Sequence, residues 1–352
     1  MYDIILAFIT SFCLTYLAIP SIINVAIKKN LVDEPGERRS HKISTPSLGG
    51  IAIFAGTLFS IIMWTPFTYF GELQYILCAF IIIFLIGAKD DIDPMPPSTK
   101  FFGELFAAGI LVFRAKVKLT SLYGFFGIYE ISEASSIILS IFTIIVIINA
   151  FNLIDGINGL SGSLGVLINA ILGTWFYLTG SIEISIVAFS LCGALIAFLK
   201  YNITPARIFM GDTGALLLGL VSAILAIKFI EMHNGLQNSP YTFASAPSLA
   251  IAILILPLFD TLRVFILRAI EGKSPFNPDR KHIHHILIDL GLSHMQATGV
   301  LFLTNIIFII IAISLQGVGN LMLLIIILIL AWLLSYLASV LVAKKKKMNL
   351  EQ

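Results

Sequence analysis

Charged residues are scarce in this sequence. They make up 12% of its 352 residues, whereas an ordinary soluble domain carries about 25%. Hydrophobic residues account for 58%, so the polar side chains are too few to cover a surface exposed to water. The same shortage of charge excludes a disordered chain, and a net charge of +2 excludes a basic face for nucleic acid. The composition therefore indicates an integral membrane protein.

Cysteines and nucleotide-binding glycine motifs are also lacking. The three cysteines, Cys13, Cys78 and Cys192, all lie within apolar stretches. None is in a loop where it could pair, which excludes a disulfide scaffold and says nothing about the redox compartment. A P-loop motif and a Rossmann glycine motif are both missing, so the sequence carries no signature of a soluble kinase.

Long apolar stretches are what the sequence has instead. A helix needs about 20 apolar residues to cross a bilayer, and the stretch at 99–114 is the weakest candidate because it is short and contains Glu104. Eleven candidates are found, at 4–27, 48–66, 74–88, 99–114, 135–150, 160–179, 182–200, 213–231, 247–267, 295–314 and 320–342. We expect an all-α, polytopic membrane bundle of about eleven transmembrane helices. It forms one domain over residues 1–343, followed by a basic cytoplasmic tail at 344–352.

Basic residues predict the orientation of this bundle. The first stretch has no basic residue before it and is followed by Lys28 and Lys29, so it is not a cleaved signal peptide and the N-terminus is expected outside. With eleven spans, 18 of the 22 Lys and Arg residues then fall on the cytoplasmic side, as the positive-inside rule requires. The C-terminus and the long loop at 268–294 are expected in the cytoplasm.

Polar residues gather in five groups, all on the expected cytoplasmic side. In the first group, Asp90, Asp91 and Asp93 would repel one another unless a cation lay among them, and oxygen ligands favour Mg²⁺ or Mn²⁺. A solvated acidic loop balanced by Lys89 is the simpler alternative. A transporter would place its key charges near the bilayer midplane. The shared position at one face therefore favours chemistry at the inner membrane surface.

The second group lies where the fifth predicted span ends. Asn149, Asn152 and Asp155 recur every three residues, so they share one helix face. The run 156–159, Gly-Ile-Asn-Gly, then lets the backbone turn and approach a ligand closely. Capping of a helix end explains one such residue but not four.

The third group stands directly before the eighth predicted span. Asp212 and Thr213 lie between Gly211 and Gly214, and either could be an N-cap and nothing more. The functional interpretation is that amides at a helix start favour phosphate, while a carboxylate there can hold a metal that bridges to it.

The fourth and fifth groups are basic. Arg280 is followed by His282, His284 and His285, which together could hold a diphosphate. A zinc site is the alternative, but no cysteine accompanies these histidines and a closed tetrahedral set is not evident. Lys42 belongs to the fifth group, a basic stretch beside the first span for which lipid headgroup contact is the simpler explanation.

The combination points to one kind of reaction. Carboxylates that suit Mg²⁺, basic residues and glycine-rich backbone at one membrane face favour phosphoryl transfer between a diphosphate substrate and a partner held in the lipid. A lipid or ion transporter and a catalytically silent scaffold are the alternatives from other classes. Spacing and composition do not name the substrates.

The ordered segments resemble a known family. Asp90-Asp91 and the runs 149–160, 209–214 and 275–285 are similar to the signature of the polyprenyl-phosphate N-acetylhexosamine-1-phosphate transferases. The run 282–285, His-Ile-His-His, resembles the WecA/TagO-like branch rather than the MraY-like one. The resemblance implies transfer of GlcNAc-1-phosphate from UDP-GlcNAc to undecaprenyl phosphate with release of UMP, as the first membrane step of cell-envelope polysaccharide synthesis. Another UDP-HexNAc is the alternative donor.

The resemblance also implies roles for the acidic residues. Asp212 would be the principal Mg²⁺ ligand, with Asn152 and Asp91 beside it and Mn²⁺ as an alternative ion. Asp90 would act as base, positioning group or nucleophile, with Asp91 supporting it. Asp155 would lie near the nucleotide as a further catalytic residue.

The remaining implications concern binding and location. Phe209 would stack on uracil, and Asn158 stands where many members carry Asp, so it has no acid or base role. The implied substrate-binding residues are Lys42, Asn149, Asn152, Asn158, Phe209, Arg280, His282, His284 and His285. The protein is expected as a multi-pass protein of the inner (plasma) membrane, with membrane lipid as a partner, no nucleic acid, and a homodimer suggested by analogy.

Overall fold

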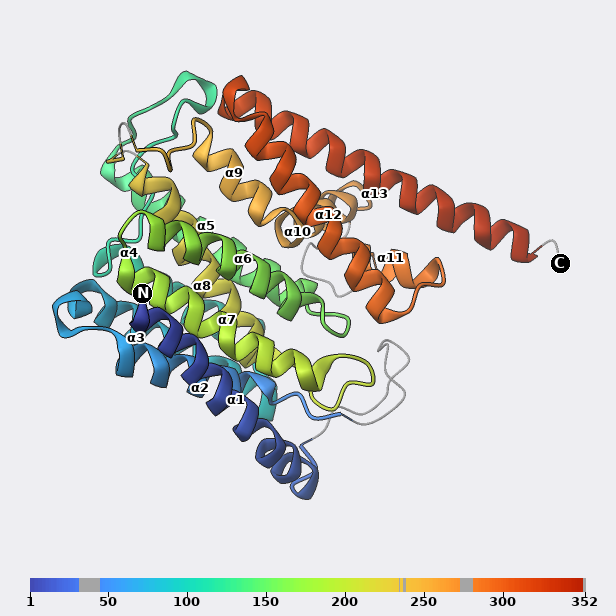
Figure 1. The fold of residues 1–352 in the computed structure, drawn as a ribbon. Helices are drawn as coiled ribbons and strands as arrows, with labels where there is room; N and C mark the ends of the chain where they lie inside the picture. Colours follow the sequence, from blue (N-terminus) through green and yellow to red (C-terminus); the bar gives the residue numbers. More distant parts are fainter. Residues whose placement is uncertain (32–44, 234, 237–238, 273–280, 351–352) are drawn as a thin grey trace.

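In the computed structural model the chain is a bundle of α-helices (Figure 1). The structure describes residues 1–31, 45–233, 235–236, 239–272 and 281–350. The helices are α1 (Tyr2–Lys28), α2 (Gly49–Trp64), α3 (Phe70–Ile92), α4 (Pro97–Phe113), α5 (Glu133–Ile154), α6 (Leu160–Leu178), α7 (Ile182–Asn202), α8 (Gly211–Met232), α9 (Ala246–Ile253), α10 (Ile255–Ile270), α11 (Ile283–Asp289), α12 (His294–Ser314) and α13 (Asn320–Leu350). The all-helical prediction is confirmed over these residues.

Each of the eleven predicted spans overlaps a helix, and the stretch at 247–267 overlaps the pair α9–α10. Among the described residues, eight helices are long and apolar enough to cross a membrane, and the pair α9–α10 makes a ninth candidate. The helices α2 and α4 have 16 and 17 residues. At 1.5 Å per residue they reach only about 25 Å, against a hydrocarbon core of about 30 Å. The protein is a multi-pass membrane protein, while a count of eleven spans and the side of each terminus stay predictions.

Helix α8 forms the centre of the bundle. In an apolar 18-residue stretch of α8, 94% of the residues are buried, whereas the corresponding stretches of α1 and α13 are 28% and 22% buried. Helices α2, α3, α5, α6, α7 and α9 pack against it, which explains why α8 is apolar on all sides. Gly50 of α2 lies against the backbone of Gly214, where a Cβ atom would collide. Such small residues let membrane helices approach closely where lipid supplies no hydrophobic drive.

Helices α9 and α10 meet at a sharp bend of 81°. Pro257, in the first turn of α10, has no N–H to donate to the carbonyl of Ile253. The side-chain amide of Asn305 in α12 donates to that carbonyl instead, at 3.1 Å. Beyond the bend, α10 is amphipathic, with Leu262 and Ile270 among its exposed apolar side chains. The bend therefore has a local chemical cause and turns α10 away from the direction of α9.

The last helix, α13, is longer than the others and extends beyond the body of the bundle (Figure 1). It continues through Lys344 and the lysines that follow, which the sequence analysis assigned to a separate basic tail. The Nζ of Lys345 donates to the carbonyl of Leu290, at the C-terminal end of α11, at 2.8 Å. A cation at this end of a helix is favourable because the last carbonyls lack amide partners.

The end of α8 far from Asp212 also carries charged side chains. Glu231 accepts hydrogen bonds from the amide and the hydroxyl of Thr120, at 2.6 and 2.9 Å, and one from the phenol of Tyr123. One turn away, Lys228 donates to Glu72 of α3 at 3.3 Å. The Glu231 contacts fasten the connection between α4 and α5 to the central helix, and the Lys228 contact joins that helix to α3.

Candidate active site

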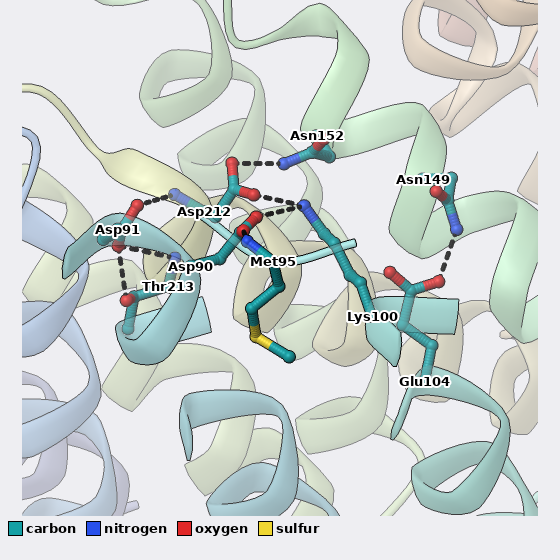
Figure 2. A network of polar contacts seen from close by, with 9 residues as sticks. All are labelled: Asp90, Asp91, Met95, Lys100, Glu104, Asn149, Asn152, Asp212 and Thr213. Atoms are coloured by element: carbon teal, nitrogen blue, oxygen red, sulfur yellow. Dashed lines mark hydrogen bonds and ion pairs between the residues drawn. The ribbon is translucent and has the colours of Figure 1, made fainter. Parts of the chain in front are cut away.

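The aspartate pair at the end of α3 meets the start of α8 (Figure 2). One oxygen of Asp91 accepts from the amide of Asp212 at 2.6 Å, and the other from the amide and hydroxyl of Thr213 at 3.0 and 2.5 Å. Helix α8 has no capping side chain of its own, so Asp91 satisfies its first amides from another helix. Gly211, at φ +69°, lies beside Ser47 and the Asp91 carboxylate, where any Cβ would collide.

Asp212 projects from this capped turn into a polar cluster (Figure 2). One carboxylate oxygen accepts from the side-chain amide of Asn152 at 2.9 Å, and the other from the ammonium of Lys100. Lys100 also lies 3.2 Å from Asp90, whose second oxygen accepts from the amide of Met95 at 2.7 Å. The first three polar groups of the sequence thus meet at one place.

Lys100 belongs to this cluster, and the sequence analysis missed it. It was counted only among the basic residues that predict the orientation of the bundle. It belongs to α4, whose weak hydropathy was the available signal: ionisable residues within apolar stretches are retained where they are used. Four residues on, Glu104 is buried to 1% exposure and accepts from the side-chain amide of Asn149 at 2.6 Å. Asn149, predicted to bind substrate, is therefore joined to Glu104 beside the cluster (Figure 2).

The loop after α5 is held from two sides. Asn158 donates to the hydroxyl of Thr204 at 3.0 Å, and its carbonyl accepts from Thr298 of α12 at 2.9 Å. Asp155 accepts from the hydroxyl of Ser161. Burial raises the pKa of the Asp155 carboxyl to about 6, and the nearby charge of Asp212 adds to the shift although the Ser161 bond opposes it.

Phe209 is the predicted base-stacking residue. Its amide donates to the carbonyl of Pro46 at 2.8 Å, and its own carbonyl accepts from the amide of Gly49 at 2.9 Å. These two bonds hold the segment before α8 against the start of α2. Phe209 as a whole is half-buried, and its stacking role stays a prediction.

The histidine segment packs against the loop after α5. His284 is buried to 1% exposure, and a Cβ atom on Gly156 would collide with its ring. Burial lowers the pKa of His284 to about 3, so its imidazole is neutral at pH 7. The ring of His282 stacks on it at 5.6 Å between centroids, and that of His285 lies tilted against it at 4.3 Å. The predicted residues Lys42 and Arg280 lie outside the described residues.

The donor types at this site fit a hard divalent cation. Asp90, Asp212 and Asn152 offer oxygen ligands. The ammonium of Lys100 pairs with Asp90 and Asp212, while the third carboxylate, Asp91, accepts from the start of α8. Surplus negative charge with oxygen donors is the environment that Mg²⁺ and Mn²⁺ prefer. In the described part of the chain, no three His, Cys, Asp or Glu side chains are arranged as a finished metal site.

The helical bundle and its acidic centre define a multi-pass membrane protein with a polar site at one end of its central helix. The model of glycosyl transferase family 4 matches residues 73–230, which contain the whole acidic cluster. The chain is 34% identical over 321 residues to a probable undecaprenyl-phosphate N-acetylglucosaminyl 1-phosphate transferase of Bacillus subtilis, covering 90% of this chain and 86% of the relative. This chain therefore belongs to glycosyl transferase family 4, as its motifs predict.

Two further relatives agree with this assignment. The undecaprenyl-phosphate alpha-N-acetylglucosaminyl 1-phosphate transferase of Salmonella typhimurium is 30% identical over 279 residues, covering 78% of this chain and 73% of the relative. The decaprenyl-phosphate N-acetylglucosaminephosphotransferase of Mycolicibacterium smegmatis is 30% identical over 321 residues, covering 86% and 79%.

Proposed function

We propose that this protein transfers GlcNAc-1-phosphate from UDP-GlcNAc to undecaprenyl phosphate and releases UMP. Two of its relatives are named as undecaprenyl-phosphate N-acetylglucosaminyl 1-phosphate transferases. The observation that carries the proposal is the cluster of Asp90, Lys100 and Asp212. Phosphoryl transfer requires carboxylates for a metal and a fixed cation for phosphate oxygens at the same place, with little other chemistry from the protein.

The metal would be Mg²⁺, with Mn²⁺ as a substitute. We assign Asp212 as its principal ligand, with Asn152 beside it, because the side-chain N–H of Asn152 already donates to the Asp212 carboxylate. When bound, the ion would neutralise the diphosphate charge. The sequence analysis gave Asp91 a ligand role as well. Its oxygens already accept three hydrogen bonds, so we propose that Asp91 instead orients Asp212 by capping α8.

The acceptor side of the reaction centres on Asp90. Its carboxylate is oriented by the amide of Met95 and the ammonium of Lys100. We propose that it positions the undecaprenyl phosphate, or accepts its proton, for attack on the sugar-linked phosphorus of UDP-GlcNAc. The bond from that phosphorus to UMP breaks as the new one forms, so one phosphoanhydride replaces another. Lys100 would exchange a carboxylate partner for phosphate oxygens during this step.

The donor side is formed by the loop after α5 and the histidine segment. The contact of His284 with Gly156 makes these two segments one wall, which supports a shared role in holding the donor. We assign the uracil and ribose to Phe209, Asp155 and Asn158. The diphosphate and sugar would contact the remaining predicted residues: Lys42, Asn149, Arg280, His282, His284 and His285. The reaction would take place at the cytoplasmic face of the inner membrane.

A direct assay tests the reaction. Protein purified in detergent is given undecaprenyl phosphate, UDP-GlcNAc and Mg²⁺, and UMP release is followed with and without EDTA. We expect release that requires the lipid phosphate and stops with EDTA. Asp93→Asn is the matched control for changes at Asp90, because Asp93 is exposed at the same helix end and pairs only with Lys89 among the contacts described.

Two other outcomes correct the proposal in different ways. Release of UMP with a different UDP-HexNAc and none with UDP-GlcNAc keeps the mechanism and changes the donor. No release with any UDP-sugar, from folded protein that moves lipid or ions across liposomes, replaces the enzyme with a transporter.

A further inference from the structure

Helix α10 contains buried charges for which the reaction above has no role. Asp260 and Arg263 are 1% and 5% exposed, although the surrounding stretch is apolar. Burying a carboxylate and a guanidinium is unfavourable unless both are paired and hydrogen-bonded. Their partners lie in the segment that leads into α11, so these charges connect α10 to the histidine motif.

Three successive residues of that segment are held by this pair. Arg263 lies 3.9 Å from Asp260 and donates to the carbonyl of Lys281 at 2.7 Å. One oxygen of Asp260 contacts Nδ1 of His282 at 2.8 Å, and the other accepts from the amide of Ile283 at 2.8 Å. The imidazole is thus attached to a fixed carboxylate whose own position is fixed by two further groups.

This geometry determines which nitrogen of the ring can meet a ligand. A carboxylate oxygen only accepts, so Nδ1 of His282 must carry the proton in this contact. The ring is further restrained by the stacked, nearly parallel ring of His284, with an interplanar angle of 10°. Nε2 is then the one nitrogen of His282 left for a substrate, as in other sites where a carboxylate orients a functional imidazole.

We propose that Asp260 is a positioning residue for the donor substrate. It holds His282 with Nδ1 protonated and Nε2 available to the diphosphate or sugar of UDP-GlcNAc, while Arg263 holds Asp260 and the segment before His282. This inference rests on the proposed function for the identity of the ligand. The orientation of the ring can be tested without it.

A double-mutant cycle on UMP release tests the functional part. We expect His282→Gln and Asp260→Asn each to lower kcat/KM for UDP-GlcNAc about 10- to 100-fold, as for loss of one charge-assisted hydrogen bond. The KM for undecaprenyl phosphate should stay unchanged. The double variant should be no worse than His282→Gln alone, because Asp260 acts through that ring. Multiplied losses in the double variant, or an equal rise in both KM values, would show a general packing role and overturn the proposal.

Glu271→Gln is the matched control for this cycle. Glu271 also pairs with the segment, through Lys281, but this contact is partly exposed to solvent. An exposed ion pair contributes little, so we expect less than a twofold effect. A loss comparable to that of Asp260→Asn would mean that any contact to the segment matters, and the specific role of Asp260 would be rejected.

Nitrogen-15 NMR of protein labelled at histidine tests the orientation independently of turnover. We expect a signal of an Nδ1-protonated imidazole that disappears in His282→Gln and shifts in Asp260→Asn but not in Glu271→Gln. His233, whose Nδ1 contacts the carbonyl of Phe229, should give a second such signal that all three variants retain. Failure of the transferase assay with the His282 signal present would reject the reaction and keep the Asp260–His282 pair. Absence of the His282 signal in the wild-type protein would reject the Asp260–His282 pair even if UMP is released. This test uses the wild-type protein, so it remains valid if Asp260→Asn fails to fold.

Discussion

The two ends of α8 carry similar residues in different charge balance. At the Asp212 end, the described contacts bring together the carboxylates of Asp90, Asp91 and Asp212, and the ammonium of Lys100 is their one cationic partner, paired with Asp90 and Asp212. At the opposite end, Glu72 lies 3.0 Å from Lys116 and 3.3 Å from Lys228, and the donors to Glu231 among the described residues are neutral. One cluster therefore has surplus negative charge, while the other is close to neutral.

This difference distinguishes a candidate site from a structural fastening. A balanced cluster satisfies its own groups and gains nothing from a further ion. An unbalanced acidic cluster is stabilised by whatever cation enters, so it binds a metal and the phosphates that the metal carries. The predictions that follow test this distinction at each end of the helix.

The largest effect is expected for Asp212→Asn. It removes the charge that we assign to the metal and should lower UMP release at least about 10³-fold, because the losses on removing central catalytic groups are of this size or larger. Melting in detergent should not fall, since one repelling carboxylate is removed. Turnover within several-fold of the wild-type value would refute the metal assignment.

Lys100→Met should have opposite effects on catalysis and metal binding. Turnover should fall by about 10²-fold with the loss of a cation for phosphate. Mn²⁺ binding to the substrate-free protein, followed by electron paramagnetic resonance, should become tighter, because the ammonium no longer occupies the carboxylates. Lys228→Met, at the balanced end, is the control and should change neither quantity. Weaker Mn²⁺ binding in Lys100→Met would contradict the competition.

Glu231→Gln should affect stability alone. The amide cannot accept as strongly from Thr120 and Tyr123, so we expect a loss of about 1–3 kcal/mol in the free energy of unfolding. UMP release measured below the melting range should remain within about twofold. A large loss of turnover in folded protein would show that this end of α8 communicates with the site.

The smallest effect concerns pH, where His284 and Asp155 act with opposite sign. The pKa of His284 is lowered to about 3, so the unfolded chain binds the proton first and stability falls from pH 7 to pH 6. The pKa of Asp155 is raised to about 6, so the folded chain binds that proton and stability rises over the same range.

Melting at the two pH values checks these signs. Relative to the wild-type protein, His284→Gln should resist acidification better and Asp155→Asn should resist it less. The same ranking for both variants would show that one of the two groups does not have the environment described. Asp289→Asn, exposed on α11, serves as a control for the assay itself.

Much of the fold and part of the site could be predicted from the sequence. The length of the apolar stretches located every long helix. Repulsion among neighbouring carboxylates singled out Asp90, and a carboxylate at a predicted helix start singled out Asp212, in both cases as groups that a cation would stabilise. That Asp91 caps α8 was not predictable, because the N-cap interpretation looked only at Asp212 and Thr213 themselves, whereas the cap comes from a residue 121 positions away. A local pattern does not report a partner on another helix.

Two other features were missed although signals for them were present. Pro257 within the span predicted at 247–267 marks a break in the helix, and the structure has the bend of 81° there. Asp260 and Arg263 follow within the same stretch, where charges are unfavourable unless paired. Arg263 and Lys100 were used only to predict the orientation of the bundle, so the sequence analysis did not ask which carboxylates they pair with.

The enclosure of α8 has a consequence for how the membrane protein is made. Of the helices that pack against it, α2, α3, α5, α6 and α7 precede it in the chain and α9 follows it, so most of its neighbours leave the ribosome before it does. Asp90, Asp91, Lys100 and Asn152 are therefore all synthesised before Asp212. The acidic centre is completed only when α8 enters the space between helices already inserted. A nascent chain ending before residue 211 has four of these five groups and lacks the one that joins them.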